Sequence, residues 1–382
     1  MRDIGVALSG GGSRAAAFHL GCLRALHDLG LLHRVRVISG VSGGALLAAL
    51  YAYGPPDFAE FDTMATDLLR RGLQRELVWH FFTSLRGVQA GLSVASLPAA
   101  VMVHLAQRLA PTLTPGHATM PWQGPEWLRR VNRTTAFVDV LGERLFGNRL
   151  MPNVTHRGLD IVLTACDLGT GGTVRFGSRS SACSRLGVIL DDVRVASAVA
   201  ASAAYPALLP ALEQRYRLRA RSGREVERVL LLTDGGVYDN LGLSVLDVDR
   251  DENFTSHVYR VDYVIACDAG LGQLKPAAPH IWPTRMSRVI KIMHGRAQHG
   301  ERGRLYAAAS SGKLSGFVYA YLGMQDDHLP VVISDLVPRD IVASYPTDFG
   351  AMSGRNLDAL STRGEQLVRA LLPYYCTSLI QC

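Results

Sequence analysis

The chain has 382 residues, of which 48% are hydrophobic and 19% are charged, and it contains no low-complexity run. This composition argues against a disordered protein and predicts a globular chain with a sizeable core. The formal net charge is +7, and arginine rather than lysine supplies most of the basic residues. Because these arginines are spread along the chain, the charge permits attraction to anionic surfaces but identifies no partner.

Strands and helices are predicted to alternate at the start of the chain. Buried strands are expected at Ile4–Leu8 and Val35–Ile38, because both are short apolar runs that lead into glycine-rich turns. A helix with one apolar face is expected from about Arg14 to Leu29, and another at Ala45–Tyr53 before a Gly-Pro-Pro stop. This order predicts an α/β fold with a mostly parallel central sheet, covered by helices on both faces.

Helical patterns replace strand patterns from Asp57 to about Gly158. They lie at Phe58–Leu77, Ala99–Leu109 and Pro125–Leu145, and we expect a helical insertion that covers one edge of the sheet. Later strands are predicted at Leu159–Ala165, Val174–Phe176, Arg228–Leu232, Tyr263–Asp268 and Val331–Ser334, and a terminal helix at Asn356–Leu372. No linker or repeat divides the chain. Residues 1–382 are therefore expected to form a single domain, with the insertion at about 57–158 and a C-terminal extension after about 270.

Targeting and membrane segments are not expected. The first apolar run turns at once into a glycine loop, which leaves no room for the core of a cleaved signal peptide. Three uncharged stretches, at 37–56, 87–103 and 195–212, carry turn residues or are too short to span a bilayer, although an interfacial helix is the alternative for 87–103. The six cysteines show no regular spacing, so no disulfide framework is predicted. The expected location is cytoplasmic or peripheral to a membrane.

A Gly-x-Ser-x-Gly motif, Gly40-Val41-Ser42-Gly43-Gly44, stands between a predicted strand and a predicted helix. In that context the serine lies at the apex of a sharp turn, and Gly40 and Gly44 remove side chains that would collide there. The helix that follows directs its positive dipole end toward charge that develops on a substrate. We therefore predict that Ser42 is a nucleophile.

A glycine-rich turn, Gly10-Gly11-Gly12-Ser13-Arg14, follows the first strand, and its backbone N–H groups suit an anion. A dinucleotide site would need an acidic residue at the end of the second strand, and a phosphate-binding loop would need Gly-Lys-Ser/Thr; neither is present. An oxyanion hole built from Gly10, Gly11 and Gly12 is the favoured interpretation. Arg14 would orient this loop or meet a phosphate headgroup.

An acidic residue ends a third apolar strand, in Leu231-Leu232-Thr233-Asp234-Gly235-Gly236. A carboxylate at that point can lie beside Ser42 at the same edge of the sheet. An ordinary Asp-Gly turn is the alternative for this segment taken alone. The two preceding motifs favour a catalytic role for Asp234, with Gly235 and Gly236 shaping its turn.

Together these segments resemble the patatin-like phospholipase family. The family's motifs occur in its order: Gly10–Arg14, Gly40–Gly44, the block Ala201-Ser202-Ala203-Ala204-Tyr205-Pro206, and Asp234-Gly235-Gly236. The resemblance implies a three-layer sandwich and a Ser42–Asp234 dyad without histidine, metal or cofactor. It also implies hydrolysis of lipid acyl esters, of the phospholipase A or lysophospholipase type, by peripheral association with a membrane or micelle surface. No nucleic acid partner is expected.

Two other functions remain open from the sequence. A Ser-His-Asp esterase acting on small soluble esters would use one of the histidines that follow Asp234, namely His257, His280, His294, His299 or His328. It is disfavoured because such enzymes usually place the nucleophile later in the chain. A non-catalytic lipid- or nucleotide-binding module would need neither Ser42 nor Asp234. No histidine, cysteine or acidic cluster has metal-ligand spacing.

Overall fold

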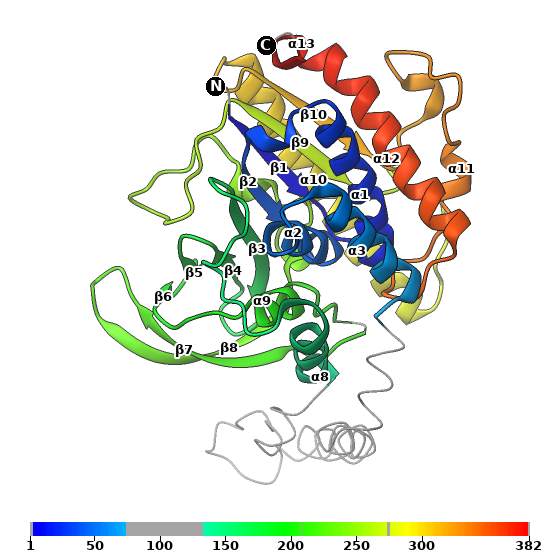
Figure 1. Ribbon diagram of the computed structural model, residues 1–382. Helices are drawn as coiled ribbons and strands as arrows, with labels where there is room; N and C mark the ends of the chain where they lie inside the picture. The colour runs from blue at the N-terminus through cyan, green and yellow to red at the C-terminus, as the bar shows by residue number, and fades with distance from the viewer. Residues whose placement is uncertain (1–2, 74–132, 207, 273–275, 381–382) are drawn as a thin grey trace.

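A computed structural model of the chain describes residues 3–73, 133–206, 208–272 and 276–380 (Figure 1). Within this part of the chain, ten strands form one sheet. Their order across the sheet is β10 (Gly316–Tyr321), β9 (Tyr263–Asp268), β1 (Ile4–Leu8), β2 (Val35–Gly40), β3 (Asp160–Asp167), β4 (Gly172–Gly177), β5 (Ser181–Cys183), β6 (Gly187–Ile189), β7 (Leu212–Arg219) and β8 (Glu225–Asp234).

The sheet has a parallel half and an antiparallel half. Strands β10, β9, β1, β2 and β3 pair in parallel, as the sequence predicts for the centre of the sheet. Strands β3 to β8 pair antiparallel, and β8 also pairs with β3, so these strands close into a ring. The predicted α/β class is confirmed, whereas β5, β6 and β7 are not anticipated by the sequence analysis.

Helices cover both faces of the sheet. The helices among the described residues are α1 (Gly12–Asp28), α2 (Gly43–Tyr53), α3 (Phe58–Arg71), α8 (Arg133–Leu141), α9 (Val195–Ser202), α10 (Trp282–Ser310), α11 (Arg339–Val342), α12 (Gly354–Tyr375) and α13 (Thr377–Ile380), and a π-helical turn follows α8. Side chains alternate between the faces, so Val6 and Ile38 join the core under α1, α2 and α12. Ala7 and Val37 contact the opposite core, which includes Leu305 of α10.

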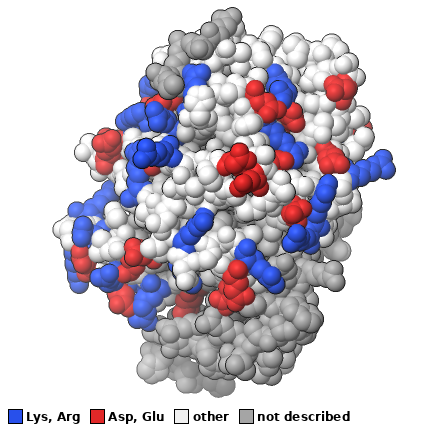
Figure 2. All heavy atoms as spheres, viewed as in Figure 1, with Lys and Arg blue, Asp and Glu red and all other residues white. Residues whose placement is uncertain are grey.

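The face seen in Figure 2 carries basic and acidic side chains intermixed rather than a patch of one sign. On the β7–β8 hairpin, Arg215 pairs with Glu227 and Arg219 with Glu225 across the two strands. Exposed pairs of this kind contribute little to stability, but they neutralise one another's field. The charge on this face therefore marks no partner, as the sequence predicts.

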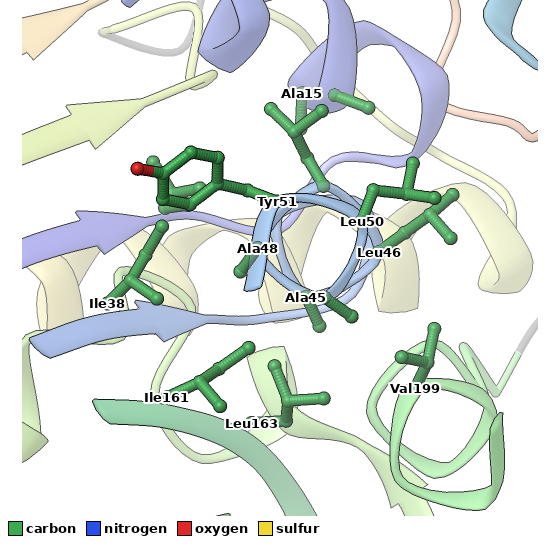
Figure 3. Close-up of a cluster of buried hydrophobic side chains, with 14 of the residues drawn as sticks. Ala15, Ile38, Ala45, Leu46, Ala48, Leu50, Tyr51, Ile161, Leu163 and Val199 are labelled. Atoms are coloured by element: carbon green, nitrogen blue, oxygen red, sulfur yellow. The ribbon is translucent and has the colours of Figure 1, made fainter. Parts of the chain in front are cut away.

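Helix α2 lies at the centre of the larger core and is buried along its whole length. Figure 3 shows Ala45 and Ala48 facing the strand residues Ile38, Ile161 and Leu163. A helix that is apolar on every side has no solvent face, so packing fixes both its position and its rotation. The turn that precedes α2, which contains Ser42, is therefore held in a fixed position as well.

Helices α1 and α12 cross with their backbones in contact. A Cβ added to Gly21 of α1 would lie 1.7 Å from the Ser361 carbonyl oxygen, and one added to Gly364 of α12 would lie 2.2 Å from the Phe18 carbonyl oxygen. Both positions therefore require glycine. Since α12 belongs to the segment after residue 270, the C-terminal extension is built into the same core as the N-terminal helix.

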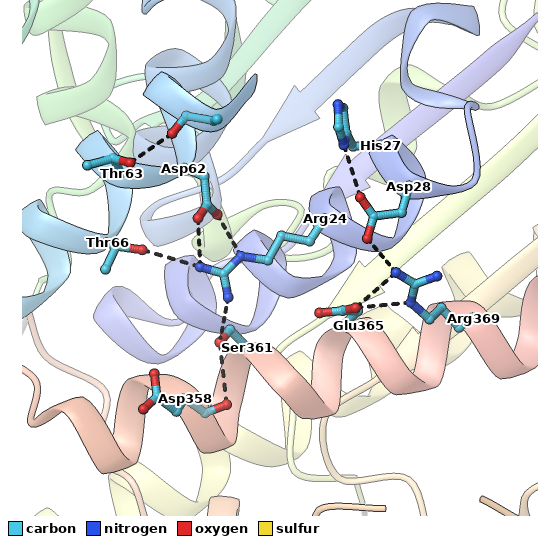
Figure 4. A network of polar contacts seen from close by, with 11 residues as sticks. Arg24, His27, Asp28, Asp62, Thr63, Thr66, Asp358, Ser361, Glu365 and Arg369 are labelled. Atoms are coloured by element: carbon cyan, nitrogen blue, oxygen red, sulfur yellow. Dashed lines mark hydrogen bonds and ion pairs between the residues drawn. The ribbon is translucent and has the colours of Figure 1, made fainter. Parts of the chain in front are cut away.

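Ion pairs reinforce this crossing on its solvent side (Figure 4). Arg24 of α1 donates to Asp62 of α3 at 2.6 Å and to Ser361 of α12 at 3.1 Å. Arg369 of α12 pairs with Asp28 at the end of α1 at 2.5 Å. These contacts join three helices from distant parts of the sequence into one layer.

Several predicted elements differ from the structure. No strand forms at Val331–Ser334, and Val332 is fully exposed there. The edge strand of the sheet is instead β10, in which buried Val318 and Ala320 alternate with half-buried tyrosines. Helix α3 ends at Arg71 because Gly72 takes a positive φ of 70°. Of the helix predicted at Pro125–Leu145, residues from 133 onward form α8 and the π-helical turn, and the earlier part lies outside the described residues. The predictions at 87–103 and Ala99–Leu109 lie outside them too.

Five cysteines fall within the described residues, and all five are buried free thiols: Cys22, Cys166, Cys183, Cys267 and Cys376. None of the described helices combines the length and the apolar character needed to cross a bilayer.

Glu301 is a buried acid that connects α10 to the body of the protein. Its side chain hydrogen-bonds Asp239 and lies near Asp268, and burial, followed by these two carboxylates, raises the pKa of Glu301 to about 9. Near neutral pH this side chain is therefore protonated in the folded state and ionised in the unfolded state, where a glutamate titrates near its ordinary pKa. Folding must then take up a proton, and stability falls as the pH rises from about 5 to about 9.

Glu301→Gln removes this proton uptake while keeping the side-chain size and a donor toward Asp239. We expect the variant to be more stable than the wild type at pH 8, by about 4–5 kcal/mol, and equally stable near pH 4. Urea unfolding at both pH values measures the difference. Equal stability of the two proteins at pH 8 would show that Glu301 is ionised in the fold.

Candidate active site

Ser42 occupies the turn between β2 and α2 and has φ 53° and ψ −118°. Among the described residues it alone has a positive φ without being a glycine, which is a strained backbone conformation. Its neighbours leave no room for side chains: a Cβ on Gly40 would lie 2.7 Å from Ala45 Cα, and one on Gly44 would lie 2.3 Å from the Leu8 carbonyl oxygen. The structure thus gives a steric reason for both motif glycines.

Ser202 holds this turn against β3. The Ser42 N–H donates to the Ser202 hydroxyl oxygen at 3.0 Å, and the Ser202 hydroxyl donates to the Thr164 carbonyl at 2.6 Å. All three groups are buried. Ser202 lies in the Ala201–Pro206 block, and membership of that block is the only sequence signal for this contact.

Asp234 reaches Ser42 through the pairing of β8 with β3. Strand β2 occupies the edge of β3 along Asp160–Leu163, and the end of β8 occupies the same edge along Ala165–Asp167. The chain leaving β2 therefore meets the chain ending β8, and the Ser42 hydroxyl hydrogen-bonds the Asp234 carboxylate. The structure brings together the two side chains that the sequence analysis pairs.

The Asp234 carboxylate is buried, with 4% of the residue exposed. Burial raises the pKa of Asp234 to about 6, against the opposing effects of the hydrogen bonds from Ser42 and from the Gly236 N–H, the latter at 2.7 Å. Such a carboxylate is a stronger base than an ordinary aspartate and is still ionised at neutral pH. It is therefore suited to accept the proton of the hydroxyl beside it.

The glycine loop passes directly beside Ser42. A Cβ on Gly10 would lie 3.4 Å from Ser42 Cβ, and the Gly10 N–H donates to the Asn240 carbonyl at 2.9 Å. Gly10 therefore has no free donor. Gly11 (φ 144°) and Gly12 (φ 60°) take conformations that favour glycine, and their N–H groups meet no acceptor among the described residues. Of the three predicted oxyanion-hole glycines, these two keep available amides.

Arg14 joins the glycine loop to the C-terminal extension. Its Nη1 donates to the Tyr345 carbonyl at 3.2 Å, and the neighbouring Ser13 N–H donates to the Asp348 carbonyl at 2.6 Å. A Cβ on Gly12 would lie 2.3 Å from that same Asp348 oxygen. The segment 345–350 of the C-terminal extension thus contacts the glycine loop through Ser13 and Arg14, and the loop-orienting role of Arg14 stays a prediction.

The Asp-Gly-Gly turn depends on close backbone contacts. A Cβ on Gly235 would lie 2.0 Å from the Thr164 carbonyl oxygen, and one on Gly236 would lie 2.6 Å from Asn240 Oδ1. Asn240 also contacts the loop at Gly10, so it links the acid turn to the glycine turn. Sequence reasoning assigns Asn240, six residues after Asp234, only to shaping the loop that follows the acid, and it does not predict the contact with Gly10.

The histidines that follow Asp234 have other surroundings. His257 is buried, and its Nε2 hydrogen-bonds the Ser180 carbonyl at 2.9 Å. His294 and His299 line a hollow beside α10 together with Asp268, a different carboxylate. His280 and His328 are exposed, and none of these side chains is a hydrogen-bond partner of Asp234 in the described structure.

Comparison with known proteins identifies a family and a fold. The family model described as patatin-like phospholipase matches residues 6–247. No curated protein sequence matches the chain. Among solved structures, human GIVD cytosolic phospholipase A2 is similar at 14% identity with a TM-score of 0.50, covering 100% of this chain and 59% of that chain.

Two bacterial proteins are also similar in structure. VipD from Legionella pneumophila has 15% identity and a TM-score of 0.39, covering 100% of this chain and 67% of that chain. The type III effector ExoU of Pseudomonas aeruginosa has 17% identity and a TM-score of 0.35, covering 100% of this chain and 53% of that chain. The chain therefore spans little more than half the length of ExoU and of the human phospholipase.

Ser202→Ala should destabilise the protein by about 1–3 kcal/mol, because it leaves the buried Ser42 N–H and Thr164 carbonyl without their shared partner. Urea unfolding of this variant measures the loss. Ser197→Ala is the matched control, since Ser197 lies on the same helix and is buried, whereas the hydrogen bond to the Ser42 N–H comes from Ser202. Equal stabilities of the two variants would mean that the Ser202 bridge does not hold the turn.

Proposed function

Because the chain belongs to the patatin-like phospholipase family, we propose that it hydrolyses lipid acyl esters, as a phospholipase A or lysophospholipase. Family membership supports lipid hydrolase activity. The observation that carries the finer proposal is the hydrogen bond between the Ser42 hydroxyl and the buried Asp234 carboxylate, beside the Gly11 and Gly12 amides. A nucleophile, a base and anion-binding donors are the three parts that acyl transfer requires.

In the first half of the proposed reaction, Ser42 Oγ attacks the ester carbonyl carbon while its proton passes to Asp234. The carbonyl oxygen becomes an oxyanion, which the Gly11 and Gly12 N–H groups stabilise, helped by the positive end of α2. The C–O bond then breaks, and the alcohol leaves with the proton held by Asp234. The acyl group remains as an ester of Ser42.

In the second half, Asp234 removes a proton from water, and the resulting nucleophile attacks the acyl carbon. The same amides stabilise the second oxyanion. Collapse of this intermediate releases the fatty acid, and Ser42 recovers its proton from Asp234. Every proton transfer thus uses one carboxylate whose raised pKa, about 6, matches the task better than the pKa of an ordinary aspartate.

The contacts of the described histidines favour this dyad over a Ser-His-Asp esterase. A triad histidine would have to bridge Ser42 and Asp234, whereas those two side chains bond each other, and His257 bonds Ser180 instead. A non-catalytic binding module would not need a strained serine turn, which is costly to maintain. The substrate is proposed to be a lipid at a membrane or micelle surface, reached by peripheral association.

A fluorophosphonate probe tests the nucleophile. We expect the wild type to be labelled covalently, Ser42→Ala to be unlabelled, and both to give the same circular dichroism spectrum. Ser39→Ala is a suitable control, because Ser39 is buried in the preceding strand. Labelling that survives in Ser42→Ala would assign the nucleophile to another residue.

Asp234→Asn removes the base while nearly preserving its shape. We expect fatty-acid release from a phospholipid or lysolipid to fall by about 10²–10⁴-fold in kcat, the usual contribution of a positioned base. Replacing His257, His294 and His299 individually by Gln should leave kcat within a few-fold of the wild type. If any one of these histidine variants loses activity as Asp234→Asn does, the enzyme uses a triad.

The pH dependence follows from the buried carboxylate. Asp234 must be ionised to accept the proton, so kcat/KM should be low when it is protonated and should rise with pH through about 6. A stopped assay of fatty-acid release between pH 4 and 8 measures this rise in kcat/KM. A midpoint near 4, the value of an unperturbed aspartate, would show that burial does not tune the base.

A further inference from the structure

Helix α10 is far longer than the strands that it connects. Its 29 residues span about 43 Å, whereas the six residues of β9 or β10 span about 20 Å. The helix joins two parallel strands behind the sheet in the view of Figure 1, so it starts at their carboxyl edge and ends at their amino edge. Its last turns pack on the sheet through Leu305 and Ala308. The excess length therefore lies at the start of the helix, on the side where Ser42 leaves β2.

Residues 281–300, which are the N-cap and the first part of α10, are here called the overhanging segment, and this segment is exposed or half-buried at each described position. A hollow of about 950 Å³ separates the middle of the helix from the ends of β9 and β10. Large apolar side chains nevertheless lie on this segment in contact with solvent. The exposed fractions are 72% for Trp282, 40% for Met286, 45% for Val289 and 64% for Met293.

These four apolar residues follow one another at spacings of four, three and four, which places them in one stripe along the helix. Isolated apolar residues on a surface need no explanation, but an ordered stripe on a projecting helix indicates a binding surface. Ile290 and Ile292 are exposed beside the stripe and enlarge it.

The charge of the surrounding sequence has one sign. Residues 269–300 contain no aspartate or glutamate, and they contain the basic residues Lys275, Arg285, Arg288, Lys291 and Arg296. On the face shown in Figure 2 the two signs are mixed. A helical segment that combines an apolar stripe containing tryptophan with only basic charges, as residues 281–300 do, is complementary to an anionic lipid surface.

We infer that the overhanging segment docks the protein on anionic lipid surfaces, with the Trp282–Met293 stripe entering the interface and the basic residues meeting the headgroups. This inference rests on the proposed lipid substrate. The segment starts at the carboxyl edge of the strands, the edge at which Ser42 and Asp234 lie, so docking through it turns the catalytic edge toward the lipid. The site itself then needs no change of shape to reach a substrate in the membrane.

Vesicles of ether-linked lipids test the docking surface, because they contain no acyl ester and report binding without hydrolysis. Co-sedimentation is measured with ether-linked phosphatidylcholine alone and with added ether-linked phosphatidylserine. We expect binding of the wild type only when phosphatidylserine is present, and weaker binding in high salt. Trp282→Ser/Met293→Ser and Arg285→Glu/Arg296→Glu should each lower the partition coefficient by at least about tenfold.

Two matched controls carry the same changes elsewhere. Phe254→Ser removes an aromatic residue that is 66% exposed, and Arg224→Glu reverses an exposed charge at the β7–β8 turn. Both controls should bind vesicles like the wild type. All variants should keep the wild-type rate on a short-chain soluble ester, since none of the changed residues contacts Ser42 or Asp234.

The outcomes separate this inference from the proposed function. If lipid hydrolysis is present but the segment variants bind and hydrolyse vesicles like the wild type, the docking inference is wrong and the function stands. If the wild type binds anionic vesicles through the segment but cleaves no ester, the docking surface stands and the function is wrong. Dimerisation that depends on Trp282 and Met293, with no vesicle binding, would assign the stripe to a second copy of the chain and overturn the inference.

Discussion

The pairing of three residues at the end of β3 with the end of β8 positions the two central side chains of the candidate site. Strand β2 stops short of the end of β3, and β8 fills the vacant edge from the opposite direction. Two turns separated by almost two hundred residues of sequence (Ser42 and Asp234) thereby meet. The antiparallel ring of β3 to β8 thus brings the proposed base, Asp234, to the proposed nucleophile, Ser42, which the parallel half of the sheet provides.

Close backbone approach is the second constraint, and it explains why the site is rich in glycine. Gly10, Gly12 and Gly43 belong to two turns that touch: a Cβ on Gly43 would lie 2.1 Å from the Gly12 carbonyl oxygen. Any side chain at these positions would push the glycine loop away from Ser42. The amides that serve the proposed oxyanion can therefore be close only because both turns lack side chains. Buried α2 and the Ser202 bridge then prevent the strained serine from relaxing.

The motif-bearing half of the fold could be predicted from the sequence because its signals are local. Strand β1 begins and ends as predicted at Ile4–Leu8, and β9 does so at Tyr263–Asp268, since both are continuous apolar runs bounded by turn residues. Strands β5 and β6 have only three residues each, which is too short for any periodicity, and β7 is rich in arginine. Their strand structure comes from pairing with neighbours, which no local pattern records.

The candidate site shows the same division between features that local motifs predict and contacts between distant segments. The roles proposed for Ser42 and Asp234 rest on motifs that are contiguous in sequence, and the structure places the two side chains in contact. The engagement of the Gly10 N–H by Asn240, the bracing of the loop by Asp348 and the Ser202 bridge join residues that are far apart in the chain. Sequence reasoning also predicted a strand at Val331–Ser334, because it counted four apolar or small residues without knowing that Val332 faces water.

The hydrogen bond from the Ser13 N–H of the glycine loop to the Asp348 carbonyl bears on where a fragment of this chain can end. The family match ends at residue 247, yet β9 borders β1 on the side opposite β2, and both faces of β1 are buried. A fragment ending there would lack β9, so the apolar strand β1 would become an open edge of the sheet. It would also lack α12, which packs on α1, and the segment at Asp348 that accepts the hydrogen bond of the Ser13 N–H. We propose that residues up to the end of α12 fold as one unit. The segment that matches the family is then shorter than the smallest fragment able to hold its motifs in place.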